Sequence, residues 1–448
     1  MPRWTSTLGG EKISTFQKIG IIGLGYVGLP TAIAFYKQGF NVVGIDISKD
    51  VIENLEQGKS PLIDNSENLV IPRNSDTWKV SDNFEMVSDC DVILITVPTP
   101  VNSDKTPDLT YVVSATRSVM ENIETGRNVI LVLESTVYPG VTREVLGKVR
   151  SEIGLIEGRD VTLAYCPERV NPGTEMGVGN VARVIGCDDE KLGNELAEMY
   201  SLTTSEQSKY VGKMEVAEAS KLIENLQRDI DIALANELAI VLPRIGVDVE
   251  QVLDAAETKW NFHRHSPGIG VGGHCIPVDP YFYISIADSV GHESMLSKSA
   301  REVNEMMPKL ASIQIAEIVE GESGEKRVLV LGYSYKPELG DIRETPVHDL
   351  VIGLLEGGFE VLIWDPLVDS DDLPKEAIIV DNPYDCGELG AVVLATAHEE
   401  VINLEWGRLG KIIDDPIIYD GRRVMDRGHL ESEGWKYFGI GLPKEECV

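Results

Sequence analysis

A β-α-β pattern near the start of the chain restricts its fold more than any other feature. In the segment QKIGIIGLGYVGLPTAIAFYKQGFNVVGIDIS, an apolar β-type run at residues 19–22 leads into Gly23-x-Gly25-x-x-Gly28. An amphipathic stretch follows, and a second β-type run occupies residues 41–45. Glycines at this spacing permit a tight turn and the close approach of a diphosphate to a helix N-terminus. The pattern predicts a dinucleotide-binding Rossmann domain.

The residue after the second run is Asp46, which indicates which dinucleotide binds. A carboxylate there accepts hydrogen bonds from a ribose 2′-hydroxyl and repels a 2′-phosphate, so the expected cofactor is NAD. The predicted cofactor-binding residues in this turn and strand end are Gly23, Gly25, Tyr26, Val27, Gly28 and Asp46.

Three further apolar runs, at residues 91–100, 128–140 and 160–173, continue the α/β alternation. Ligands bind at the carboxyl ends of strands in open α/β sheets. Thr99, Thr136 and Glu168 stand at such ends, and each could equally be an ordinary cap or turn residue. We expect Thr99 and Thr136 near the cofactor and Glu168 near the substrate.

A helical run of about 30 residues, 213–242, has no internal glycine or proline. At 1.5 Å per residue it would span about 45 Å, which favours a helix that bridges domains and supports a dimer. Lys221 and Asn225 are four residues apart in it and therefore share one face.

From about Lys326 the α/β alternation restarts without a full GxGxxG, which predicts a second doubly wound domain. The expected fold class is therefore α/β, with two Rossmann-like domains joined by a long central helix. The predicted boundaries are a flexible tail (1–18), a cofactor domain (19–207), a central helical dimerisation domain (208–315) and a second Rossmann-like domain (316–448).

Charge and cysteine usage exclude several classes of function. With 40 Lys and Arg against 73 Asp and Glu, the net charge of −33 disfavours nucleic acid and anionic membranes as partners. No apolar window is long enough to span a membrane, and the N-terminus lacks an apolar signal core. Six scattered cysteines without CxxC spacing indicate neither a disulfide framework nor a zinc site, and favour a reducing cytoplasm.

One cysteine, Cys275, stands in the glycine-rich segment GIGVGGHCIPVDPYFY. Glycines let such a loop approach a ligand closely. From the residues alone, Cys275 could be a nucleophile, a metal ligand, half of a disulfide or a packing residue.

Seven motifs in order resemble the UDP-glucose/GDP-mannose dehydrogenase family over nearly the whole chain. They read GLGYVGLP (23–30), ESTVYPG (134–140), CPERVNPG (166–173), ASKLIENLQRD (219–229), GVGGHCIPVDP (270–280), YSYKPELGDIRETP (333–346) and DGRRV (420–424). The resemblance implies NAD-dependent oxidation of the C6 alcohol of a nucleotide sugar to a carboxylate. The histidine before the cysteine, His274, resembles the residue at that position in the N-acetylhexosamine branch of the family. TKWNF (258–262) resembles the glucosamine and galactosamine enzymes, whereas CPERV resembles the mannosamine enzymes, so the epimer stays open.

The same resemblance implies the roles of individual residues. Cys275 would be the covalent nucleophile, Lys221 and Asn225 would stabilise the negative oxygen of the intermediates, and Thr136 would order water. Either Glu168 or Asp279 would be the hydrolytic base. Arg343 would lie near the cofactor. The implied substrate-binding residues are Glu168, Arg169, Val170, Lys221, Asn225, Arg264, Gly272, Lys336 and Arg423.

Chemistry explains why such an enzyme needs a thiol. The aldehyde from a first oxidation has no easily removed second hydride, but a thiohemiacetal has one, and its oxidation gives a thioester that water hydrolyses. A two-electron hydroxyacid dehydrogenase would need neither Cys275 nor a second Rossmann-like domain. A non-catalytic nucleotide-sugar sensor would be expected to lack Cys275 or Lys221.

Overall fold

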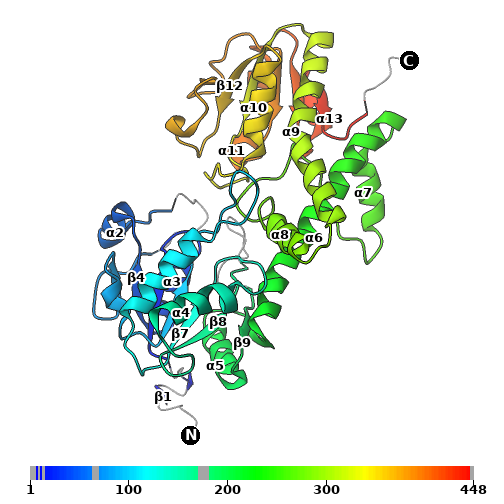
Figure 1. Ribbon diagram of the computed structural model, residues 1–448. Coiled ribbons are helices and arrows are strands. Elements are labelled where there is room, and N and C mark those ends of the chain that lie inside the picture. Colours follow the sequence, from blue (N-terminus) through cyan, green and yellow to red (C-terminus); the bar gives the residue numbers. More distant parts are fainter. Residues whose placement is uncertain (1–6, 9–10, 13–15, 63–69, 170–180, 444–448) are drawn as a thin grey trace. The chain divides into compact units, whose positions relative to one another are not determined.

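The computed structural model describes the chain except residues 1–6, 9–10, 13–15, 63–69, 170–180 and 444–448 (Figure 1). It divides into two compact units. The first comprises Met1–Glu224 and Tyr281–His292, and the second comprises Asn225–Pro280 and Glu293–Val448. Within the predicted tail, a short β1 (Thr7–Leu8) pairs antiparallel with β2 (Glu11–Lys12).

The first unit is built on an eight-stranded sheet in which the β8–β9 pair is antiparallel and the other pairs are parallel. In spatial order its strands are β10 (Lys209–Gly212), β9 (Val184–Cys187), β8 (Val161–Tyr165), β7 (Val129–Leu133), β6 (Val92–Ile95), β3 (Lys18–Ile22), β4 (Asn41–Ile45) and β5 (Trp78–Ser81). The central strands are apolar throughout because helices cover both faces of a parallel sheet.

Each face of this sheet has its own apolar core, because successive side chains of a strand point to opposite faces. In β6, Val92 and Leu94 pack into one cluster and Ile93 and Ile95 into the other. The first cluster is covered by α1 (Gly28–Lys37), α2 (Lys49–Glu56) and α5 (Glu190–Ser201). The second is covered by α3 (Thr110–Asn122), α4 (Gly147–Ile153) and the start of α6 (Met214–Val241).

The second unit contains an all-parallel six-stranded sheet. Its spatial order is β13 (Ile378–Ile379), β12 (Glu360–Trp364), β11 (Arg327–Leu331), β14 (Ala391–Leu394), β15 (Ile417–Asp420) and β16 (Lys436–Gly439). One face packs on α9 (Met295–Glu322) and α10 (Pro346–Glu356). The other packs on α11 (Glu399–Ile402), α12 (Trp406–Gly410) and α13 (Arg427–Ser432). The predicted α/β class with two Rossmann-like sheets and a long central helix is confirmed.

Two helices contain a unit boundary: α6, between Glu224 and Asn225, and α8 (Asp279–Ser289). In the second unit, the end of α6 packs with α7 (Val249–Glu257) and α9 around a small apolar cluster. None of the described helices has the combined length and apolarity that crossing a bilayer requires.

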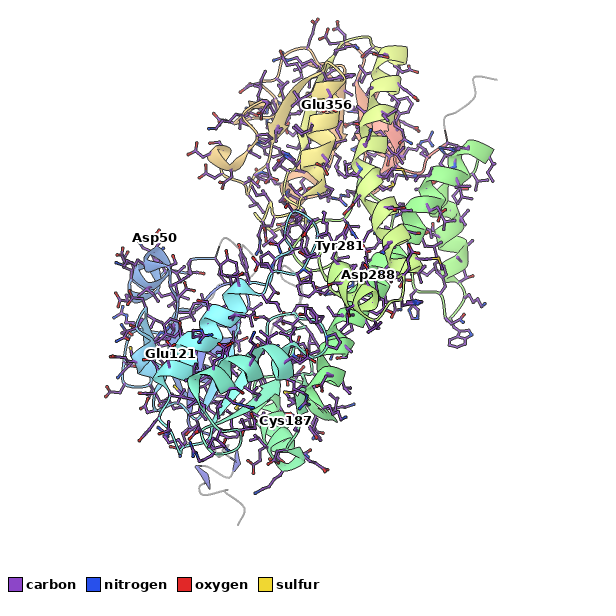
Figure 2. The ribbon with its side chains drawn as sticks, in the orientation of Figure 1. Asp50, Glu121, Cys187, Tyr281, Asp288 and Glu356 are labelled. Atoms are coloured by element: carbon purple, nitrogen blue, oxygen red, sulfur yellow. The ribbon has the colours of Figure 1, made fainter. Side chains whose placement is uncertain are left out.

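Part of the large negative charge lies on solvent-facing helix surfaces. Figure 2 labels four exposed acids as examples, one each from α2, α3, α8 and α10: Asp50, Glu121, Asp288 and Glu356. Exposed carboxylates such as these stay hydrated.

Candidate active site

The glycine turn after β3 has the geometry that a dinucleotide diphosphate requires. Gly23 has φ +93°, in the left-handed region, and its N–H donates to the carbonyl of Ile45 at 2.8 Å. A Cβ on Gly28 would lie 1.8 Å from the carbonyl oxygen of Gly23, so only glycine fits at the start of α1. Around exposed Gly25, a Cβ would meet no heavy atom of the described residues within 4 Å. The helix start is thus open to an anionic ligand.

Asp46 follows β4 and is held in place by backbone donors. One of its carboxylate oxygens accepts from the N–H of Leu24 at 2.7 Å, and the other accepts from the N–H of Ser48 at 2.9 Å. The carboxylate is half-buried beside the glycine turn. Its position and charge suit a ribose diol, so these residues fit NAD. The other predicted cofactor residues of this unit, Tyr26, Val27 and Thr99, are half-buried in loops at the same edge of the sheet.

The carboxyl ends of β7 and β8 carry the other predicted residues of the first unit. Thr136 and Glu168 are half-buried there, and Arg169 pairs with Glu224 at 2.6 Å. Lys221 on α6 is only 7% exposed. Val170 lies outside the described residues.

Beneath Glu168 lies a buried ionic network that the sequence did not reveal. Arg183, 2% exposed, lies 3.7 Å from an oxygen of Glu134 and 3.9 Å from one of Glu168. It also donates to the carbonyl of Pro167 at 3.2 Å. Tyr200 donates to the other oxygen of Glu134 at 2.6 Å. Burial raises the pKa of Glu134, and the guanidinium of Arg183 opposes that rise.

Through its contacts with Pro167 and Glu168, Arg183 supports the segment after β8 and orients Glu168. The available sequence signal was an arginine beside an apolar strand, in ARVIGC, which is usually a surface position.

In the second unit, Cys275 is half-buried in the glycine loop. Its carbonyl accepts from the N–H groups of Val278 at 3.1 Å and Asp279 at 2.8 Å, a turn that leads into α8. Asp279 is 2% exposed and accepts a hydrogen bond from the amide of Asn225 at 2.5 Å. The structure therefore brings Asn225, Asp279 and the cysteine loop together. Lys221 and Asn225 lie one turn apart on α6, on either side of the unit boundary.

The cysteine loop packs against the turn after β11. A Cβ on Gly272 would lie 2.6 Å from Cβ of Tyr335, and one on Gly273 would lie 2.7 Å from the Tyr335 ring. The N–H of Gly273 donates to the carbonyl of Arg343 at 3.1 Å. These glycines let the turn that carries Lys336 approach the cysteine loop. The exposed side chain of Arg343 pairs with Asp341 at 2.5 Å.

Two predicted arginines of the second unit have carboxylate partners within it. Arg264 contacts Glu250, Asp254 and Glu257 of α7. Arg423 forms a two-pronged pair with Asp248, at 3.0 and 2.9 Å.

The neighbouring Arg422 is a candidate that sequence reasoning missed. One of its terminal nitrogens is buried with no hydrogen-bond partner among the described residues. Burial lowers the pKa of this guanidinium to about 10. A Cβ on Gly268, in the segment that leads to the cysteine loop, would lie 2.9 Å from Nη1 of Arg422. The sequence signal is the doubled arginine in DGRRV, in which the family resemblance points to the adjacent Arg423.

The described cysteines differ in exposure. Cys90, Cys166, Cys187 and Cys386 are buried, and Cys275 is half-buried. Burial raises the pKa of Cys90 to about 12 and that of Cys386 to about 11. Within the described part of the chain, no group of three or more His, Cys, Asp or Glu side chains is arranged to hold a metal ion.

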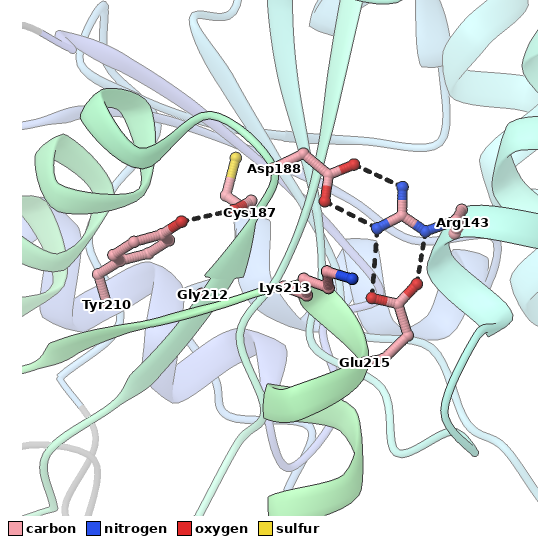
Figure 3. Close-up of a pocket in the computed structure, with 7 residues that line it drawn as sticks. All are labelled: Arg143, Cys187, Asp188, Tyr210, Gly212, Lys213 and Glu215. Carbon is pink, nitrogen blue, oxygen red and sulfur yellow. Dashed lines mark hydrogen bonds and ion pairs between the residues drawn. The ribbon is translucent and has the colours of Figure 1, made fainter.

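An open pocket of about 640 Å³ in the first unit contains none of the predicted site residues (Figure 3). Its arginine, Arg143, is bound by the carboxylates of Asp188 and Glu215. Because two carboxylates already neutralise this cation, we assign the pocket no ligand.

Comparison with known proteins identifies the family. Residues 17–204, 215–306 and 329–427 match its NAD binding, central and UDP binding domains, respectively. The chain is 36% identical over 425 residues to a UDP-N-acetyl-D-glucosamine 6-dehydrogenase of Pseudomonas aeruginosa, covering 91% of this chain and 97% of that one. The UDP-D-ManNAc dehydrogenase structure from Pyrococcus horikoshii is similar with a TM-score of 0.83, 33% identity and coverage of 95% and 99%. The structure of a UDP-glucose dehydrogenase from Pyrobaculum islandicum is similar with a TM-score of 0.83 and 28% identity, covering 95% of this chain and 98% of that one.

The chain therefore belongs to the UDP-glucose/GDP-mannose dehydrogenase family. It is an NAD-dependent nucleotide-sugar 6-dehydrogenase, an oxidoreductase that acts on a CH–OH group, and its substrate is a UDP-sugar. The resemblance inferred from the seven motifs and the choice of NAD are both confirmed.

Proposed function

We propose that this enzyme oxidises the C6 alcohol of a UDP-N-acetylhexosamine to the carboxylate, in two successive steps with a covalent intermediate on Cys275. The product would be a uronic acid precursor for surface polysaccharide or other glycans. The observation that carries the substrate class is the identity of 36% over nearly the full chain to enzymes named for UDP-N-acetyl-D-glucosamine and UDP-N-acetyl-D-mannosamine. The proposal names the N-acetylhexosamine class and leaves the epimer open.

The covalent step is assigned to the thiol of Cys275. Bound NAD supplies the hydride acceptor for each oxidation. The Cys275 thiolate adds to the carbonyl carbon of the aldehyde, which forms a C–S bond and places a negative charge on oxygen. Lys221 and Asn225 stabilise that oxygen by charge and hydrogen bonding. Loss of the second hydride leaves a thioester, and water then breaks the C–S bond to release the carboxylate and regenerate the thiol.

The hydrolytic base is assigned to the pair Glu168 and Asp279, with Thr136 ordering the water. Asp279 is buried and oriented by Asn225, and Glu168 is oriented by Arg183. A fixed carboxylate is suited to accept a proton from water when it lies within hydrogen-bond reach. Which of the two carboxylates is the base is tested with the variants Glu168→Gln and Asp279→Asn. The variant that accumulates the thioester identifies the base.

Binding of the UDP-sugar is assigned to basic residues. Lys336 and Arg423 are proposed for the nucleotide end, with Arg169, Val170 and Gly272 along the sugar. Arg264 is proposed to reach substrate across a dimer, which would require it to leave its carboxylate partners on α7. Arg343 is proposed to lie near the cofactor.

The decisive experiment supplies NAD+ and a panel of UDP-sugars, with the N-acetylglucosamine, N-acetylgalactosamine, N-acetylmannosamine and glucose compounds compared. We expect two NADH per sugar with at least one N-acetylhexosamine, and mass spectrometry should show the acid. Activity confined to UDP-glucose would overturn the substrate assignment. One NADH per sugar with an aldehyde product would identify a two-electron dehydrogenase, and no turnover would identify a binding protein.

A Cys275→Ala variant tests the covalent step. It should keep NAD+ binding and lose carboxylate formation, because no thiol remains to form the thiohemiacetal. Cys275→Ser should trap an ester, visible as an added sugar-nucleotide mass on the intact protein. Two NADH per sugar from Cys275→Ala would refute the covalent route.

We also propose that α6 forms the core of a homodimer. Its exposed apolar residues are spaced by 7 or 11 positions, which places them on one helix face. They are Val216 (50% exposed), Ile223 (48%), Leu234 (53%) and Val241 (49%). The corresponding domain division is 19–207, 208–315 and 316–448, with the helical part dimeric. The buried cysteines are consistent with a reducing cytoplasm, the location proposed here.

A further inference from the structure

In the second unit, two loops that follow neighbouring strands are fastened together by four hydrogen bonds. One is the turn Ser334–Glu338 after β11, and the other is the segment Thr396–Glu399 after β14. Thr396 Oγ1 donates to the carbonyl of Ser334 at 2.5 Å, and the N–H of Glu399 donates to the Glu338 carboxylate at 2.6 Å. The other two bonds are made by the ring of His398, at 2.9 Å to Ser334 Oγ and 3.1 Å to the N–H of Glu338.

The bonding partners of His398 define its tautomer. Its Nδ1 accepts the backbone N–H of Glu338, so Nδ1 carries a lone pair and the proton is on Nε2. The Nε2–H then donates to Ser334 Oγ, whose hydroxyl donates onward to the carbonyl of Lys336 at 3.2 Å. One imidazole therefore fixes the backbone on both sides of Lys336.

The backbone of the turn needs such support. Glu338 has φ +60°, in the left-handed region that residues other than glycine seldom adopt. A residue keeps that conformation when the surrounding structure holds it there. His398 is 1% exposed, and Ser334 is fully buried, so water does not compete for these bonds.

A carboxylate completes the support from the side of β12. Asp365 accepts from the N–H groups of Tyr333 at 2.6 Å and Ser334 at 3.0 Å, and it lies 3.2 Å from His398 Nε2. Burial alone would raise the pKa of Asp365, but the hydrogen bonds from His398 and the two backbone groups lower it to about 2. The carboxylate therefore stays ionised and holds the start of the turn.

We propose that His398 is a positioning residue for the nucleotide end of the substrate, because it holds the turn Ser334–Glu338 in the conformation that presents Lys336 to the UDP diphosphate. His398 does not itself contact the ligand. This inference rests on the proposed function through the substrate-binding role assigned to Lys336. The clamping residues lie within the matched UDP binding domain. Ser334 and Glu338 belong to the motif YSYKPELGDIRETP, whereas Asp365, Thr396 and His398 lie outside all seven motifs.

The test measures UDP binding by calorimetry, with no turnover required. His398→Ala should weaken UDP affinity at least tenfold, the order expected when one charge-assisted contact is lost. NAD+ affinity should be unchanged, because the cofactor turn lies in the first unit. His348→Ala is the matched control, since His348 bonds to the hydroxyl of Tyr333 at 2.9 Å but does not hold the turn. The control should bind UDP as the wild type does.

Two conservative variants separate the two bonds of the ring. His398→Asn places an amide oxygen near the Nδ1 position and keeps the acceptor for Glu338, whereas His398→Gln reaches toward Ser334 and keeps the donor. Each should restore part of the UDP affinity lost in His398→Ala. A folded His398→Ala protein with wild-type UDP affinity would overturn the proposal.

A double-mutant comparison shows whether the effect passes through Lys336. If His398 acts only by presenting Lys336, adding His398→Ala to Lys336→Met should cost less than twofold in UDP affinity. Additive losses would overturn the proposed route. If His398→Ala fails to fold, Ser334→Ala replaces it in the test, because this variant removes the link to the Lys336 carbonyl and keeps the imidazole ring. It should weaken UDP affinity, and wild-type affinity would overturn the proposal. Wild-type protein that binds UDP but oxidises no UDP-N-acetylhexosamine would refute the proposed substrate. The UDP affinities of the variants would still test the role of His398.

Discussion

Replacing Asp46 with Asn is expected to relax the preference for NAD. The carboxylate is fixed by the N–H groups of Leu24 and Ser48, at 2.7 and 2.9 Å, so it is already oriented before a ribose arrives. An asparagine side chain keeps one oxygen for the Leu24 N–H and therefore preserves the glycine turn. What it removes is the negative charge, the acceptor for the Ser48 N–H and one acceptor for the ribose diol.

The expected magnitude follows from these two losses. A hydrogen bond to a charged group contributes about 1.5–3 kcal/mol, so NAD+ should bind about 10–100-fold more weakly. A 2′-phosphate about 4 Å from a carboxylate is repelled by about 4 kcal/mol near a protein surface, and screening at this half-exposed position reduces that to about 2 kcal/mol. Relief of that repulsion should strengthen NADP+ binding roughly 30-fold. Together the preference for NAD+ over NADP+ should fall by about 300–3,000-fold.

The assay is calorimetric titration of each protein with NAD+ and with NADP+, which needs no sugar substrate. Asp50→Asn is the matched control: it removes an exposed carboxylate from the first turn of α2, at a position outside the predicted ribose site. It should leave the preference within about threefold of wild type, because screening weakens the field of an exposed charge. If Asp46→Asn kept the wild-type discrimination, the assigned role of Asp46 would be wrong.

Three further outcomes are expected. Asp248→Ala should lower the free energy of unfolding by about 4 kcal/mol, of which about 3 comes from leaving Arg423 without its partner and about 1 from uncapping α7. Asp248→Asn keeps the cap and should lose less free energy of unfolding. Equal losses for the two variants in a urea titration would contradict this. The pKa of Asp365 is about 2 in the folded protein, below its unfolded value of about 3.9. Its stabilising contribution is therefore present above pH 4 and is lost as pH falls toward 2. Circular dichroism should show a shallower acid transition in Asp365→Asn. Leu234→Lys should convert a dimer to monomer in light scattering, and an unchanged mass would exclude α6 as the dimer core.

The sheets were predictable because parallel strands leave a strong trace in the sequence. Val92–Ile95 and Val129–Leu133 are buried at every position, so each appears as an uninterrupted apolar run. The second long helix, α9, was harder to predict because Pro308 lies inside it. Proline usually ends a helix. Here it is buried, and a Cβ on Gly270 would lie 3.1 Å from its ring, so the missing side chain of Gly270 leaves room for a proline inside a helix that local rules would interrupt.

The candidate site could be proposed from motif and spacing, as for Asp46 after its strand and Cys275 among glycines, and the roles of both residues stay predictions. It was not predictable where function depends on which partner a side chain meets. Arg422 and Arg423 are adjacent, and only the approach of Asp248 shows that Arg423 is paired. His398 bonds to a turn about 60 residues earlier in the chain, which no local pattern encodes.

The contrast in cysteine burial provides a way to count natively folded molecules in a preparation. Alkylating reagents consume thiolates, and burial keeps Cys90 and Cys386 protonated as well as covered. Among the described cysteines, half-buried Cys275 is the one that a small reagent reaches in the native protein. Label recovered in the peptide that contains it therefore measures how many molecules present an accessible cysteine loop. Among the described cysteines, the same contrast would direct a spectroscopic reporter to that loop.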